Sequence, residues 1–429
     1  MRKLLEEAVA RGAEATLVTT ESKNTSVSFE ANRLKRIGST ESLSLEMQVI
    51  KAGKLGVASS TKPGTEMELL ENALDVAEFG SEVSYSFPEP EPPADPKVYD
   101  QAVADIDVDR MISIGEELIQ FIKAFDPAIQ GSANVSKTIS RKSISNTRGL
   151  DAQLDKTVFT VSAGFQFVEG QNLLQSWDWN VSTGLDCDLE GIKATLKADF
   201  EIGRKNVEVR PGVYDVLFTP SGFQDLVSPI LACLNGRAVM RGISPFKGRI
   251  GEQIFAPAFS LVEDGTLDGG LGTQLYDDQG VVCRRTPLIE NGVLKEYLLD
   301  LESAYRLGRQ PIGTGSPAGA NPNNLLVVPG ETPWEDLLRG MKQGIVIDHT
   351  MGAWAGNPYT GTVTGNIALG YLVKDGEKVG RVKDCMFSLN VFTHLKSNLL
   401  ALSRDVKELG ALILPYCLIG GVSIAGRDS

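Results

Sequence analysis

The chain has 429 residues, of which 42% are hydrophobic and 23% are charged. These values are ordinary for a globular protein, and at roughly 150 residues per domain the length predicts two or three domains. Acidic residues outnumber basic ones by 55 to 42, which gives a net charge of −13, and no Lys/Arg-rich stretch stands out. Nucleic-acid binding needs a basic face, so we expect no nucleic-acid partner.

The cysteines and the apolar stretches indicate the cellular compartment in which we expect the protein. The start, 1–15, is a charged amphipathic helix without the apolar core of a signal peptide. The longest apolar stretch, 411–426, is broken by Pro and Gly and is too short to span a bilayer. No C-x-x-C pair occurs, which predicts free thiols in a reducing compartment. We therefore expect a cytoplasmic protein without a membrane partner. The five cysteines are Cys187, Cys233, Cys283, Cys385 and Cys417.

The first half alternates helical and β-rich patterns. Thr65 and Glu68 have the spacing of a capping box, and Asp107 and Asp188 stand where N-caps belong. The Pro/Glu-rich segment 84–96 predicts an extended loop. We expect helices at 1–12, 65–77, 107–125 and 189–200, and strands at 15–20, 25–30, 42–50, 54–59, 137–145, 151–161 and 162–169.

A buried strand at 213–218 leads into the helix 220–235. Thr219 is the predicted N-cap and Pro220 occupies the first helical position, where its missing N–H costs nothing. Pro229 should kink this helix, or Ser228 should cap a second short helix that begins at Pro229. An ordinary core helix would show the same apolar face. The residues of that face are Phe223, Leu226, Val227, Ile230, Leu231 and Leu234.

The rest of the second half is predicted to be rich in hairpins. Asn291-Gly292 is a turn signal between β-rich runs. The Gly/Pro/Asn-rich segment 313–324 predicts a flexible loop and lacks the Gly-Lys-Ser/Thr of a phosphate-binding loop. We expect helices at 331–342 and 392–402, and strands at 286–295, 296–301, 304–307, 344–348, 361–372, 378–382 and 413–424.

Recognisable catalytic motifs are missing from the sequence. The two histidines, His349 and His394, lie far apart and have no second ligand at metal-binding spacing. Asp348 precedes His349, but neighbours on a strand point to opposite faces, so we do not expect an acid–base pair. There is no G-x-S-x-G elbow, Cys/His dyad or Walker loop. The motifs therefore predict no catalytic residue and no metal ligand.

Three blocks of sequence resemble one known family. They are SFEANRLKRIGSTESLSLEMQVIKAGKLGVASST (28–61), GRAVMRGISPFKGRIGEQI (236–254) and TPLIENGVLK (286–295). With their order and spacing, they are similar to the TldD/TldE (PmbA) family, also called modulators of DNA gyrase. Ser44, in the first block, stands where the family usually has Gly, and Gln279, in the Gly/Asp-rich segment 263–280 that also resembles the family, stands where it usually has Glu.

The resemblance implies a degenerate metal site. In the TldD branch the helix after such a strand carries HExxxH, whose two His bind zinc and whose Glu is the general base. Ser228, Pro229 and Cys233 stand at these positions here. Serine is a poor zinc ligand, proline has no carboxylate, and one thiol alone does not hold zinc. The resemblance thus implies the zinc-free TldE/PmbA-like branch, inactive alone, with no cofactor on this chain.

For the fold, we expect an α+β protein. Region 1–209 should be a helix-backed mixed sheet, with a further division into two subdomains near 84–100 left open. Region 210–429 should be a larger, mostly antiparallel curved sheet around the helix 220–235.

Three hypotheses for the function remain open. In the first, this pseudoenzyme forms a heterodimer with a TldD-like HExxxH-bearing subunit that carries the zinc, and helps bind unfolded or extended peptides. In the second, it is a stand-alone homodimeric or homo-oligomeric peptide- or ligand-binding protein with no enzymatic partner. In the third and weakest, it is an enzyme whose site the sequence does not reveal, with Cys233 as one candidate.

Overall fold

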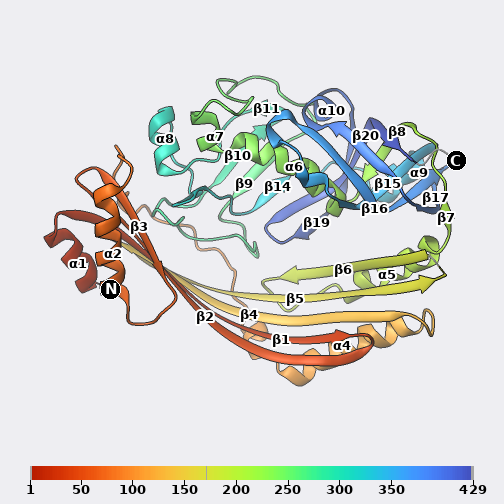
Figure 1. Cartoon of the computed structure of the whole chain (residues 1–429), viewed down its shortest axis with the longest axis horizontal. Coiled ribbons are helices and arrows are strands. Elements are labelled where there is room, and N and C mark those ends of the chain that lie inside the picture. The colour runs from red at the N-terminus through yellow and green to blue at the C-terminus, as the bar shows by residue number, and fades with distance from the viewer. Residues whose placement is uncertain (1, 171, 427–429) are drawn as a thin grey trace.

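The computed structural model describes residues 2–170 and 172–426. Figure 1 shows a long curved sheet, formed by the first half of the chain, beneath a second sheet formed by the second half. The first sheet has the strand order β3-β2-β1-β4-β5-β6, and each neighbouring pair is antiparallel. Its strands are β1 (Ala13–Glu30), β2 (Arg33–Lys51), β3 (Lys54–Ser60), β4 (Gln130–Asn146), β5 (Asp151–Glu169) and β6 (Asn172–Ser182).

Helices cover one face of this sheet. Side chains that alternate along β1, such as Val27 and Phe29, are buried against α4, because successive residues of a strand point to opposite faces. The helices of the first half are α1 (Arg2–Ala10), α2 (Glu66–Phe79), α3 (Gln101–Asp105), α4 (Val108–Lys123) and α5 (Leu189–Gly203).

The second sheet contains the parallel pairs. The strand β8 lies between β15, to which it is parallel, and β20, to which it is antiparallel. Its strands are β7 (Asn206–Val207), β8 (Gly212–Phe218), β9 (Leu261–Asp264), β10 (Arg285–Glu290), β11 (Val293–Leu294), β14 (Leu325–Val327), β15 (Gln343–Met351), β16 (Thr362–Lys374), β17 (Glu377–Val382), β18 (Met386–Asn390), β19 (Leu399–Leu409) and β20 (Leu412–Ala425).

Short elements fill the connections of the second half. They are α6 (Pro220–Leu234), α7 (Gly236–Met240), α8 (Leu301–Leu307), α9 (Trp334–Gly340), α10 (Val391–Ser397), the 3-10 turns η1 (Ala353–Ala355) and η2 (Pro358–Thr360), and the small ribbon β12 (Gly315–Ser316) with β13 (Gly319–Ala320). None of the helices in the described residues is long and apolar enough to cross a membrane.

Two cores lie on opposite faces of the second sheet. On one face α6 is buried with its apolar side, including Phe223, Leu226 and Ile230, none of which has exposed surface. On the other face Val346 and Tyr371 pack with residues of the first sheet and of α4 and α5. The second sheet is therefore held between α6 and the first half of the chain.

The α+β class is confirmed, with the parallel pairs in the second sheet rather than in the first. The N-caps predicted at Asp107, Asp188 and Thr219 are confirmed, since each side chain accepts a hydrogen bond from the first turn. The capping box at Thr65 is wrong, because the Thr65 hydroxyl donates to the Lys62 carbonyl instead.

Other local predictions are overturned by tertiary pairing. The expected helix 392–402 ends at Ser397, and Leu399 begins the strand β19, which pairs with β20. The expected strand 304–307 is the end of α8, because Asp300 caps this helix and Gly308 ends it in the left-handed region. The strands predicted at 15–20 and 25–30 are one strand, β1, since β2 and β4 pair with it along its length.

Candidate functional site

The helix α6 begins directly after β8, beside Ile347 and Asp348 of β15. The Thr219 hydroxyl donates to Asp348 Oδ1 at 2.6 Å and accepts from the Gly222 N–H at 3.4 Å, so it caps the helix and ties it to β15. Pro220 follows at the first helical position, as predicted. A side chain at Gly222 would place its Cβ 2.6 Å from the Ile347 carbonyl oxygen, so glycine is required for this close approach.

The three positions that the resemblance assigns to a degenerate zinc motif all lie on α6. Ser228 is exposed, whereas Pro229 and Cys233 are buried. Pro229 lies inside one continuous helix, so Ser228 does not cap a second helix. The Cys233 thiol lies 3.9 Å from the Pro358 carbonyl of η2. The three side chains thus lie in different surroundings, because Ser228 faces solvent and the other two are buried.

These donors do not fit a zinc ion. Burial raises the pKa of Cys233 to about 12, whereas zinc binds the thiolate. Across residues 2–170 and 172–426, no group of three or more His, Cys, Asp or Glu side chains could hold a metal. The three side chains on α6 therefore do not form a zinc site by themselves.

His349 lies at a contact between the two halves of the chain. Its ring stacks on Trp177 of β6, with the ring centres 4.1 Å apart. Its Nε2 lies 3.7 Å from Asp348 Oδ2, because β15 is irregular at this point and its two neighbouring side chains do not point to opposite faces. The expectation that the side chains of Asp348 and His349 point to opposite faces is wrong.

A buried carboxylate lies at the same contact between the halves. Asp199 of α5 accepts hydrogen bonds of 2.6 Å from Ser176 of β6 and from Tyr371 of β16. Burial, and then the nearby Asp348 carboxylate, raise the pKa of Asp199 to about 6. Burial likewise raises the pKa of Tyr371. The hydrogen bonds of Asp199 join the two halves of the chain. Among the described residues, no histidine forms a hydrogen bond with Ser176 or Tyr371.

Sequence reasoning missed this contact because its members are far apart in the chain. Tyr371 and Asp199 are separated by 172 positions, and Thr219 and Asp348 by 129. None of these residues lies in a motif with characteristic spacing. The one local signal is the run of apolar residues before Asp348, which identifies a buried strand that ends in polar residues.

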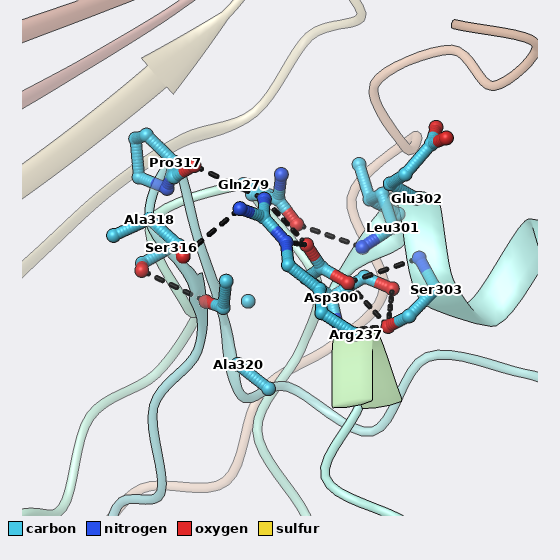
Figure 2. A network of polar contacts seen from close by, with 12 residues as sticks. Arg237, Gln279, Asp300, Leu301, Glu302, Ser303, Ser316, Pro317, Ala318 and Ala320 are labelled. Atoms are coloured by element: carbon cyan, nitrogen blue, oxygen red, sulfur yellow. Dashed lines mark hydrogen bonds and ion pairs between the residues drawn. The ribbon is translucent and has the colours of Figure 1, made fainter. Parts of the chain in front are cut away.

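The segment after α6 is held by a network around Arg237, at the start of α7. Figure 2 shows its guanidinium between Asp300 on one side and the carbonyls of Pro317 and Ala318 on the other. The Nε atom lies 2.7 Å from Asp300 Oδ2, and the two terminal nitrogens donate to the carbonyls at 2.9 and 3.1 Å. Asp300 has no exposed surface. The network therefore fixes α7, α8 and the loop around 317 to one another.

Gln279 extends this network. Its Oε1 accepts from the Leu301 N–H at 2.8 Å, in the first turn of α8 (Figure 2). A glutamate, which the family usually has at this position, could accept the same hydrogen bond. The departure at Gln279 therefore preserves the contact and removes a buried negative charge.

The five cysteines are free thiols. Four are buried and Cys187 is half-buried. Cys417, on β20, is surrounded by core residues, and burial raises its pKa well above the ordinary value. His394 of α10 contacts the carbonyls of Asn390 and Gly421. Cys417 is therefore a core residue, and His394 lies between α10 and β20.

Comparison with known proteins shows the family. Residues 211–426 match the model of the PmbA/TldA metallopeptidase C-terminal domain, and residues 15–80 match PmbA/TldA metallopeptidase domain 1. Together these matches include α6, the network around Arg237 and most of the strands β1 to β3.

Relatives of similar length support the assignment. An uncharacterised protein of Methanocaldococcus jannaschii is 26% identical over 98% of this chain and 99% of its own. The metalloprotease PmbA homologue of Haemophilus influenzae is 24% identical over 99% and 94%. A crystal structure described as a putative modulator of a DNA gyrase from Thermotoga maritima is 25% identical, covers 99% of both chains and has a TM-score of 0.90.

The fold is also that of the crystal structure of TldE from Thermococcus kodakarensis, which is 22% identical, has a TM-score of 0.90 and covers 99% of this chain and 100% of its own. The family match over the second half of the chain, joined to relatives that span nearly its whole length, leads to one conclusion: this chain belongs to the PmbA/TldA metallopeptidase family.

Proposed function

We propose that this chain is the zinc-free companion subunit of a TldD/TldE-type metallopeptidase complex. One observation carries the proposal: a chain of a metallopeptidase family contains no HExxxH in its sequence, and the resemblance puts Ser228, Pro229 and Cys233 at the positions of that motif. The zinc then belongs to a TldD-like partner that carries HExxxH. In this proposal the chain is a cytoplasmic pseudoenzyme, and the active unit is the heterodimer.

The relatives support a PmbA-like role over a TldD-like one. The PmbA homologue of Haemophilus influenzae aligns with 99% of this chain, whereas the TldD homologue of the same organism aligns with 33%. The chain thus follows the length and organisation of the relative named PmbA.

Within the complex, this chain helps to bind an unfolded or extended peptide. The first sheet ends in two edge strands, β3 and β6. Within the described ranges, no further strand of that sheet pairs with the outer edge of β6, whereas residues 81–83 already bond to the start of β3. An extended peptide can add to such an edge through main-chain hydrogen bonds, which need no particular sequence. Capture by strand addition is therefore compatible with the architecture.

The purified chain is expected not to cleave an unstructured, dye-quenched peptide above the rate of the buffer. No cluster of ligands among the described residues could hold the zinc that such hydrolysis requires, and the resemblance puts Pro229, which has no carboxylate, at the position of the general base. The same peptide should be cleaved when a TldD-like partner from the same organism is added, and a chelator should abolish that cleavage.

Two results would count against the proposal. Chelator-sensitive cleavage by the chain alone would make it a metalloenzyme in its own right. Failure to associate with the TldD-like partner in a pull-down, together with self-association and peptide binding, would instead support a stand-alone homo-oligomeric binding protein.

A further inference from the structure

A hollow of about 490 Å³ lies between the two halves of the chain, on the face of the second sheet opposite to α6. Its walls come from β6, the start of α5, β19 and the start of α9. Figure 1 shows β19 above β6, with α5 beside them. The hollow is therefore separate from the positions of the degenerate zinc motif.

Aromatic rings form part of its walls. Trp334 stacks on Tyr416 with the ring centres 4.9 Å apart. Trp179 carries the Lys407 ammonium 5.4 Å from the centre of its ring. The hollow thus already holds one cation against an aromatic face, an arrangement that attracts ammonium and guanidinium groups.

The charge of the lining is strongly negative. Five carboxylates and one ammonium group line the hollow: Asp178, Asp186, Asp188, Asp405, Glu408 and Lys407.

Three of these carboxylates have structural partners. Asp178 pairs with Lys407, and Asp188 caps α5. Asp405 accepts a hydrogen bond of 2.8 Å from the backbone N–H of Trp334. The other two, Asp186 and Glu408, have no hydrogen bond or ion pair with any described residue. Partial burial, and then the charge of Asp186, raise the pKa of Glu408. Two neighbouring negative charges are thus left without a cation.

A further acceptor in the lining lacks a donor. The side-chain oxygen of Asn180, on β6, is shielded from solvent and accepts no hydrogen bond. An unsatisfied buried acceptor costs free energy, which a ligand that carries several N–H donors can recover. Guanidinium and ammonium groups are donors only, so they match the acceptor as well as the two free carboxylates.

We propose that this hollow binds the cationic side chain, Arg or Lys, of an extended peptide. The inference rests on the proposed function in peptide capture and adds a preference for basic residues. A peptide suits the position because edge strands of both sheets, β6 and β19, border the hollow. The carboxylates of Asp186 and Glu408 would receive the N–H donors of the bound side chain, and the aromatic walls would cover its apolar stem.

The experiment uses the full chain and two fluorescent Gly/Ser decapeptides that differ at one central residue. One contains arginine and the other contains citrulline, which has nearly the same shape without the charge. Fluorescence anisotropy at low salt should give a Kd about tenfold lower for the arginine peptide, the size expected of a charge-assisted contact. High salt should reduce the difference.

The double variant Asp186→Asn/Glu408→Gln should bind the two peptides equally. Both positions are exposed, so the fold should be kept, and circular dichroism checks this. The matched control is Asp75→Asn/Glu78→Gln, which removes two exposed carboxylates from α2 and should keep the tenfold preference.

The outcomes separate this inference from the proposed function. Equal binding of both peptides by the wild-type chain would overturn the basic preference and leave peptide capture standing. A preference that survives in the double variant would place the cation elsewhere and overturn the assignment of the hollow. Binding of neither peptide would contradict peptide capture by this chain, and the inference with it.

Discussion

Replacing Arg237 with Met is expected to lower the free energy of unfolding by about 3 kcal/mol, because it leaves a buried charge without its partner. The Asp300 side chain has no exposed surface, and Arg237, itself 27% exposed, provides its ion pair. The change also removes the donors that Arg237 gives to the carbonyls of Pro317 and Ala318. Urea unfolding of the purified variant measures the loss.

The matched control is Arg339→Met. Arg339 pairs with Asp336 on the surface of α9, and exposed pairs of this kind contribute about 0.5 kcal/mol or less. If the two variants lose the same stability, the network in Figure 2 has no special role in the fold. The variant Arg237→Lys should recover part of the loss, since it keeps the charge and loses the planar group that reaches three oxygens.

The second large effect is a pH dependence that comes from Glu263. This residue is fully buried, and Asn323 donates to its carboxylate through the side-chain amide at 2.5 Å and through the backbone N–H. Burial raises the pKa of Glu263 to about 8 from its ordinary value of 4.5. The folded chain therefore holds this proton more tightly than the unfolded chain does.

The sign of the effect follows from the raised pKa. Below the unfolded pKa, both states are protonated and the contribution to stability is complete. As the pH rises from the unfolded pKa of 4.5 to the folded pKa of about 8, the unfolded chain loses its proton first and stability falls. The loss is on the order of 5 kcal/mol, taking about 1.4 kcal/mol for each pKa unit.

Unfolding curves for the wild type and Glu263→Gln, at about pH 5 and about pH 9, measure this contribution. Glutamine does not ionise, so the variant should lose much less stability than the wild type between these two pH values. The exposed control Glu78→Gln should follow the wild type. Parallel pH dependence in the wild type and Glu263→Gln would show that Glu263 ionises normally in the folded chain.

Local signals in the sequence predicted part of the fold. Thr219 and Pro220 start α6 because a side-chain acceptor and a residue without an N–H satisfy the first turn without tertiary help. The cap at Asp107 is equally local. By contrast, Leu399–Leu409 became a strand through its pairing with β20, which no helical or strand periodicity within that segment could indicate.

Only the part of the site that resembles the known family could be predicted from the sequence. The resemblance identified the helix that carries Ser228, Pro229 and Cys233, and the assignment of these positions remains a prediction. The contacts of His349 with Trp177, and of Asp199 with Tyr371, depend on how the two sheets meet. The hollow beside β19 also forms where the two sheets meet. Its carboxylates and aromatic rings come from segments far apart in the chain, so no sequence motif contains them.

The absence of resident zinc is the central claim, and elemental mass spectrometry of the gently purified chain tests it most directly. The account predicts zinc far below one atom per chain, because no described cluster of ligands could hold it. One zinc atom per chain that survives gel filtration would contradict the account. It would require His349, His394 or the cysteines to converge on a metal, and the companion-subunit proposal would fall.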